Sequence, residues 1–89
     1  ETSTGVATDI KALGEVVAAT PAVLVVDAIS GLGAIELKTD AWHVDAVVSG
    51  SQKGLMLPPG LAFLSVSAKA WALNAASTSA PRWPPSIRA

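Results

Sequence analysis

Two charged side chains, Asp27 and Lys53, follow apolar runs that have the composition of buried β-strands. Asp27 comes directly after residues 22–26 (AVLVV). A carboxylate at the carboxyl end of such a strand lies where open α/β sheets bind ligands. It needs a partner there, for example a cationic group on a ligand, because an unpaired buried charge is costly. The alternative is that Asp27 caps the turn that follows the strand.

Lys53 belongs to a loop of small residues, 49–54 (SGSQKG), that follows a second apolar run at 45–48 (DAVV). Small residues let a ligand approach the backbone, and serine hydroxyls with free N–H groups suit a phosphate. A lysine in this loop can pair with an anion or, if its pKa is depressed, form a Schiff base. A solvated loop lysine is the alternative.

The composition narrows the possible functions. The 89 residues are 51% hydrophobic and 15% charged, with a mean hydropathy of +0.49, which is unusually apolar for a short chain. The chain contains no cysteine, so it offers no disulfide, thiolate metal site or cysteine nucleophile. His43 is the single histidine, which leaves no histidine cluster for a metal. A net charge of −1 without a basic stripe argues against a nucleic-acid partner.

The apolar segments also argue against a membrane partner. The longest apolar run, residues 22–29, is interrupted by Asp27 and is too short to cross a bilayer. The first residues lack the order of charges and apolar residues that marks a signal peptide. We therefore expect a soluble, intracellular protein.

Strands and helices are expected to alternate, which predicts an α/β architecture. The unbroken β-branched run at 22–26 is typical of a strand buried on both faces, as in a parallel sheet covered by helices. Apolar residues recur at helical spacing between residues 8 and 19, with Thr8 or Asp9 as the N-cap. The expected elements are helices over 8–19, 41–43 and 68–76 and strands over 22–26, 45–48 and 61–66.

Three sequence blocks together resemble the class V pyridoxal-phosphate aminotransferases, in particular the alanine–glyoxylate and serine–pyruvate aminotransferase-like group. The blocks are residues 1–6 (ETSTGV), 24–33 (LVVDAISGLG) and 49–60 (SGSQKGLMLPPG). Such enzymes are several times longer than this chain. The resemblance implies that residues 1–76 are the central part of the large domain of a fold-type-I enzyme, a three-layer α/β fragment with a mainly parallel sheet flanked by helices. Residues 77–89 depart from the family pattern, and we expect this proline-rich tail to be poorly ordered.

The resemblance also implies roles for individual residues. Lys53 would be the Schiff-base lysine that holds pyridoxal 5′-phosphate and moves the proton of the substrate α-carbon. Asp27 would pair with the protonated pyridine nitrogen. Ile29 would pack against one face of the ring, Thr2 would hydrogen-bond the ring hydroxyl oxygen, and Gln52 would contact the phosphate.

The implied reaction moves an amino group from a small amino acid, alanine or serine, to a 2-oxo acid, glyoxylate or pyruvate, in a homodimeric parent enzyme. The 89-residue chain alone is expected to be inactive, because the family's glycine-rich phosphate loop and substrate-binding arginine lie outside it. Two alternatives stay open: a lyase or desulfurase relative that uses the same lysine and aspartate, and a non-catalytic remnant or interaction module. A free-standing nucleotide-binding domain is disfavoured because Glu36 replaces the third glycine of its fingerprint.

Overall fold

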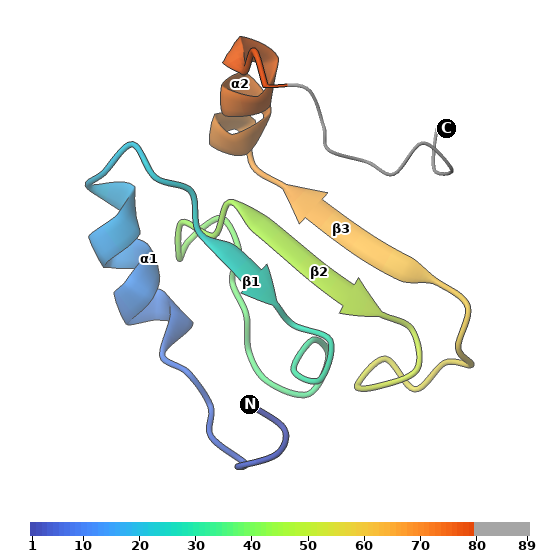
Figure 1. The fold of residues 1–89 in the computed structure, drawn as a ribbon. Helices are drawn as coiled ribbons and strands as arrows, with labels where there is room; N and C mark the ends of the chain where they lie inside the picture. Colours follow the sequence, from blue (N-terminus) through green and yellow to red (C-terminus); the bar gives the residue numbers. More distant parts are fainter. Residues whose placement is uncertain (80–89) are drawn as a thin grey trace.

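The computed structural model describes residues 1–79, and these form a small α/β unit (Figure 1). The predicted short helix over 41–43 is wrong: these residues form a turn, and His43 adopts a left-handed conformation with φ of 55°. Residues 80–89, most of the predicted tail, lie outside the described residues. Along the chain the elements are α1 (Ile10–Ala18), β1 (Val25–Asp27), β2 (Ala46–Gly50), β3 (Ala62–Val66) and α2 (Ala68–Ala76).

Both helices begin at side chains that cap them. The Asp9 carboxylate accepts a hydrogen bond from Ala12 N–H at 3.0 Å, so α1 starts at Ile10. The Ser67 hydroxyl accepts one from Ala70 N–H at 3.1 Å and starts α2 in the same way. These caps use local sequence signals, and the sequence-based expectation for α2 agrees with its observed bounds.

The sheet has the order β1-β2-β3 and is mixed. β1 and β2 run parallel, with Asp27 opposite Val48, whereas β2 and β3 run antiparallel. The connection over residues 28–45 is long enough for the crossover that a parallel pair needs. The connection over 51–61 contains no helix, and the chain simply reverses. The α/β class is confirmed, and the expected parallel pairing holds for β1 and β2 only.

The first strand is shorter than the apolar run that predicted it. β1 exists only where β2 lies alongside it, and the pairing begins at Val25 opposite Ala46. One residue earlier, Leu24 N–H donates instead to the side chain of Asp45 at 2.9 Å. The strand therefore occupies Val25–Asp27 rather than residues 22–26.

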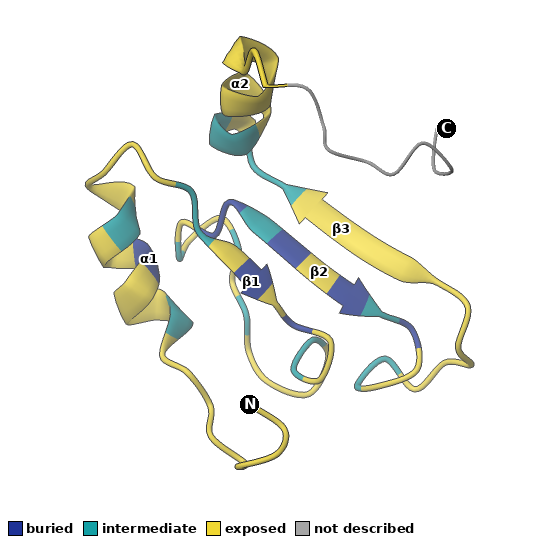
Figure 2. Cartoon of the chain, viewed as in Figure 1, coloured by how far each residue is buried: buried dark blue, intermediate teal, exposed yellow. Residues whose placement is uncertain are grey.

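A small apolar core covers one face of the sheet. Val26 and Val47 are opposite each other in β1 and β2, and both are buried together with Ala28 and Val44 (Figure 2). Ile10 at the start of α1 packs against this core, as does Trp42. Further along α1, Gly14 is buried, and a Cβ there would lie 1.8 Å from the carbonyl oxygen of Trp42. Helix α1 thus packs with its backbone against the 38–44 turn.

The other face of the sheet carries exposed apolar side chains. Val25, Val48 and Leu64 are 61%, 36% and 66% exposed, and the strand register puts Val48 and Leu64 side by side. Helix α2 buries none of its residues. Within residues 1–79 the strands are therefore buried on one face only, because α1 and the 38–44 turn cover that face and these residues do not form a third layer.

No helix within the described part of the chain is both long and apolar enough to cross a membrane.

Candidate functional site

Asp27 and Lys53 lie at the same edge of the sheet. Asp27 is the last residue of β1, and Lys53 lies in the loop that leaves β2. Because β1 and β2 are parallel, their carboxyl ends point in one direction, and the loops that follow them are neighbours (Figure 1). This is the edge at which open α/β sheets bind ligands.

The Asp27 carboxylate is exposed, and only one of its two oxygens is hydrogen-bonded to the protein. One of its oxygens accepts a hydrogen bond from Ile29 N–H at 3.0 Å, which is the turn cap that the sequence left as an alternative. Within residues 1–79, Asp27 makes no other side-chain hydrogen bond and no ion pair. The cap and a ligand partner are compatible, since each needs one of the two oxygens.

Thr2 reaches the same edge from the N-terminal loop. Its hydroxyl donates a hydrogen bond to the Ser30 hydroxyl at 2.6 Å, in the turn that follows Asp27. Ile29 lies in that turn and is 38% exposed. The structure therefore brings Thr2, Asp27 and Ile29 to one end of β1. Their roles toward a cofactor stay predictions.

Lys53 and Gln52 are both exposed in the loop after β2. The backbone carbonyl of Lys53 accepts a hydrogen bond from Met56 N–H at 2.9 Å. Its ammonium group makes no hydrogen bond or ion pair with another described residue, and it does not contact the Asp27 carboxylate. A ligand that engages both side chains must therefore bridge them.

The serine hydroxyls of this loop point inward. Ser49 donates to the carbonyl of Ala28 at 3.2 Å, and Ser51 donates to the carbonyl of Pro58 at 2.6 Å. Both serines are buried. The expectation that these hydroxyls are free to bind a phosphate is therefore wrong, because the Ser49 hydroxyl ties the end of β2 to the turn after β1 and the Ser51 hydroxyl holds the loop. Gln52 is left as the exposed polar side chain next to Lys53.

The turn after Asp27 and the loop that carries Lys53 touch through glycines. A Cβ at Gly54 would lie 2.5 Å from the carbonyl oxygen of Leu32, and one at Gly33 would lie 3.0 Å from the carbonyl oxygen of Gly54. Gly33 also has a φ of 87°, which strains any other residue. This backbone contact places the turn after Asp27 directly against the loop that carries Lys53.

The groups at this edge fit the cofactor that the sequence resemblance implies. A carboxylate and a free amine are presented from adjacent loops, with a hydroxyl and an amide beside them. That donor set matches pyridoxal 5′-phosphate, whose ring nitrogen, aldehyde and phosphate need a carboxylate, an amine and hydrogen-bond donors, respectively.

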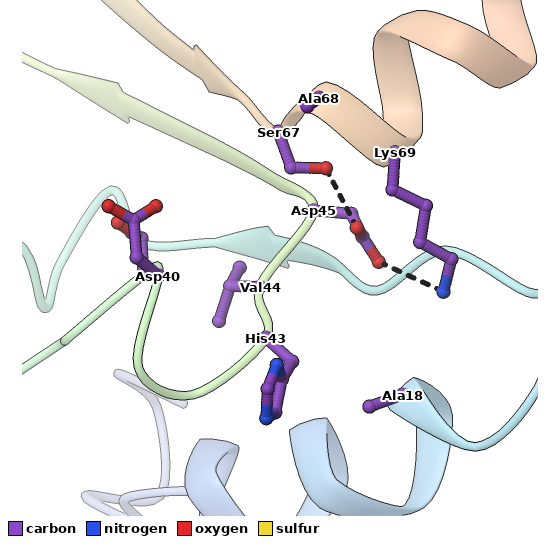
Figure 3. Close-up of a pocket in the computed structure, with 9 residues that line it drawn as sticks. Ala18, Asp40, His43, Val44, Asp45, Ser67, Ala68 and Lys69 are labelled. Carbon is purple, nitrogen blue, oxygen red and sulfur yellow. Dashed lines mark hydrogen bonds and ion pairs between the residues drawn. The ribbon is translucent and has the colours of Figure 1, made fainter.

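An open pocket of about 350 Å³ lies elsewhere, at the opposite end of the strands (Figure 3). Asp45 is one of the residues that line it and is only 5% exposed. The Asp45 carboxylate accepts hydrogen bonds from Leu24 N–H at 2.9 Å and from the Ser67 hydroxyl at 2.8 Å, and it lies 3.8 Å from Lys69 Nζ. Burial raises the pKa of the Asp45 carboxyl, but these hydrogen bonds and Lys69 outweigh it and hold that pKa below its ordinary value.

The contacts of Asp45 hold the beginnings of β1 and β2 and the start of α2 together. The sequence alone does not indicate these contacts, because Asp45 is the first residue of the strand predicted over 45–48. The sequence signal for a partnered carboxylate is a charged residue at the head of an apolar run, since buried carboxylates require partners. The pocket contains none of the five predicted site residues. We therefore infer that Asp45 stabilises the fold and takes no part in catalysis.

Comparison with known proteins adds the family context. The sequence pattern of the class-V aminotransferases matches residues 1–78. The chain is 56% identical over 72 residues to the small subunit of a soluble hydrogenase from Synechococcus sp., covering 80% of this chain and 19% of that protein. It is 50% identical over 72 residues to an L-aspartate–glyoxylate aminotransferase from Paracoccus denitrificans, covering 79% of this chain and 18% of that enzyme.

Among solved structures, an alanine–glyoxylate aminotransferase from Nostoc sp. superimposes with a TM-score of 0.83 at 34% identity, covering 89% of this chain and 21% of that one. The chain thus spans about one fifth of the length of the relatives it matches.

Proposed function

Because the chain belongs to the class-V aminotransferase family, we propose that it is a segment of the cofactor-binding domain of an enzyme that transfers amino groups with pyridoxal 5′-phosphate. The observation that carries the proposal is the parallel pairing of β1 with β2, which directs Asp27 and the Lys53 loop to one edge of the sheet. In this proposal residues 1–76 contribute to that domain, and the tail over 77–89 stands apart from it.

Each site residue has one task. When bound, the cofactor supplies a ring that accepts the electrons released at the substrate α-carbon. Lys53 Nζ would hold the cofactor; once the substrate amine has displaced it, the freed amine would take the proton from the substrate α-carbon and deliver it to C4′ of the cofactor. The free oxygen of Asp27 accepts a hydrogen bond from the ring nitrogen and keeps that nitrogen protonated. Thr2 orients the ring through its hydroxyl, Ile29 covers one ring face with apolar surface, and Gln52 donates to the phosphate.

The substrates we propose are a small amino acid and a 2-oxo acid. The names of the Paracoccus and Nostoc relatives share glyoxylate and differ in the amino acid. Glyoxylate, with pyruvate as the alternative, is therefore our proposed acceptor, and alanine or serine the donor. The donor is selected by parts of the polypeptide outside this segment. We propose that the complete enzyme is a homodimer.

The decisive experiment is Lys53→Ala in the full-length polypeptide that contains this segment, produced with pyridoxal 5′-phosphate. The parent protein is expected to show a visible absorption band from the lysine-bound cofactor, and borohydride reduction followed by peptide mapping is expected to label Lys53. Lys53→Ala should abolish the band and the transfer of amino groups to glyoxylate. Lys11→Ala is the control. It replaces an exposed lysine that lies on α1, away from the site, and should change neither the band nor the transfer of amino groups.

A visible band that persists unchanged in Lys53→Ala would refute the assignment. The two remaining alternatives have their own tests. A lyase or desulfurase would release its product from one amino acid without consuming a 2-oxo acid. For a non-catalytic remnant, titration of the 89-residue chain with the cofactor and borohydride would label lysines diffusely or not at all, whereas a partly formed site would label Lys53 selectively.

A further inference from the structure

Ser51 is completely buried, with no exposed surface, two residues before Lys53. All of its polar groups are hydrogen-bonded. Its N–H donates to the carbonyl of Leu61 at 3.1 Å, and its carbonyl accepts from Leu57 N–H at 3.0 Å. Its hydroxyl donates to the carbonyl of Pro58 at 2.6 Å and accepts from Leu61 N–H at 3.3 Å.

These bonds close the loop that carries Lys53. The chain leaves β2 at Gly50, passes through Lys53 and returns to Leu61 beside Ser51 before β3 begins. Within residues 1–79 the carbonyl of Pro58 accepts no hydrogen bond from a backbone N–H, and the Ser51 hydroxyl is its donor. Ser51 therefore closes the loop with hydrogen bonds from both its backbone and its side chain.

The other side of Lys53 is also restrained. The Lys53 carbonyl is bound to Met56 N–H, and the next residue, Gly54, lies against the backbone of Leu32. Because the backbone is anchored on both sides of Lys53, the amine moves mainly by rotation about the bonds of its own side chain. Loss of the Ser51 hydroxyl would leave the Pro58 carbonyl without its partner and would release one of these anchors.

We propose that Ser51 is a positioning residue, whose buried hydroxyl closes the 51–61 loop and thereby holds the Lys53 amine where the cofactor requires it. The inference rests on the proposed function of Lys53. It assigns to Ser51 a role through the loop and not a contact with the ligand. A misplacement of a reacting group by about 1 Å is enough to lower the rate about 10²-fold.

The test compares Ser51→Ala with Ser67→Ala in the full-length polypeptide loaded with pyridoxal 5′-phosphate. Ser67 is a matched control, because its hydroxyl also donates one hydrogen bond, to Asp45, and accepts one, from Ala70 N–H, but at the far end of the sheet. Three quantities are measured: the thermal unfolding midpoint, the pH midpoint of the visible absorbance of the lysine-bound cofactor, and kcat with KM.

Both variants are expected to lower the unfolding midpoint. Only Ser51→Ala is expected to shift the pH midpoint of the absorbance and to lower kcat about 10²-fold, with a much smaller change in KM. An unchanged absorbance midpoint and kcat in Ser51→Ala would overturn the inference, and so would equal losses in both variants, which would mark a purely structural role.

If Ser51→Ala does not fold, Ser51→Cys decides, because a thiol fills the space of the hydroxyl, although it is somewhat larger, and makes weaker hydrogen bonds. A shifted absorbance midpoint in Ser51→Cys supports the inference, and a wild-type midpoint overturns it. Failure of the proposed function is recognised separately, since the unmodified protein would then show no lysine-bound cofactor band.

Discussion

Replacement of Asp45 tests how the strands are held in register at the end opposite the candidate site. In Asp45→Ala, Leu24 N–H and the Ser67 hydroxyl lose their shared acceptor. A hydrogen bond to a charged group contributes about 1.5–3 kcal/mol, so the two together are expected to contribute about 3–6 kcal/mol. The ion pair to Lys69 adds at most about 1 kcal/mol, because the lysine is partly exposed and 3.8 Å away. This sum is a large fraction of the roughly 5–15 kcal/mol available to a small domain.

Asp45→Asn is the milder change. It keeps the size of the side chain and one acceptor oxygen, and we expect it to lower the free energy of unfolding by about 2 kcal/mol at neutral pH. The assay is urea unfolding, followed by circular dichroism, of the full-length polypeptide that contains this segment. Asp40→Asn is the control, since Asp40 lines the same pocket but its side chain makes no hydrogen bond to the described residues.

The stabilisation by the Asp45 carboxylate is expected to depend on pH, and the lowered pKa of Asp45 sets the direction of the change. The pKa of Asp45 is lowered in the folded chain, so the unfolded chain takes up the proton first as the pH falls. The stabilisation by the carboxylate is therefore fully present above the ordinary aspartate pKa of about 3.9 and is lost as the pH falls through the lower folded-state value. The difference between wild type and Asp45→Asn should shrink from pH 5 to pH 3. Equal stability of Asp45→Asn and Asp40→Asn at pH 7, or a difference that widens in acid, would refute the reasoning.

Two further predictions concern the candidate site and the uncovered face of the sheet. In the full-length polypeptide, Asp27→Ala should lower the turnover number about 10²–10³-fold and weaken cofactor retention, because the ring nitrogen loses its partner; near-normal turnover in steady-state kinetics would contradict this role. For the 89-residue chain, sedimentation velocity should show self-association through the apolar face. Leu64→Lys, which puts a charge into that face, should reduce it, while Glu15→Lys on α1 should not, and equal association of these two variants would argue against the face as its cause.

Local signals determined where most elements lie and which residues merit attention. The alanine-rich run over 68–76 predicted α2, and helical apolar spacing with Thr8 or Asp9 as the N-cap predicted α1. These features act between residues a few positions apart, so they are readable without the fold. Asp27 and Lys53 were identified in the same way, as polar residues that follow apolar runs, and their cofactor roles remain predictions that the mutants above will test.

The tertiary structure decided what depends on distant partners. The apolar run at 22–26 could not reveal that pairing starts only at Val25, because the register is set by β2 and by the Asp45 side chain. Nor could it reveal that one face of the sheet stays uncovered within residues 1–79, since burial belongs to the neighbours of a strand and not to its composition. Ser51 shows the same limit most clearly: the sequence offers a hydroxyl near a lysine, and only the return of the chain to Leu61 turns that hydroxyl inward, away from a ligand and onto the loop itself.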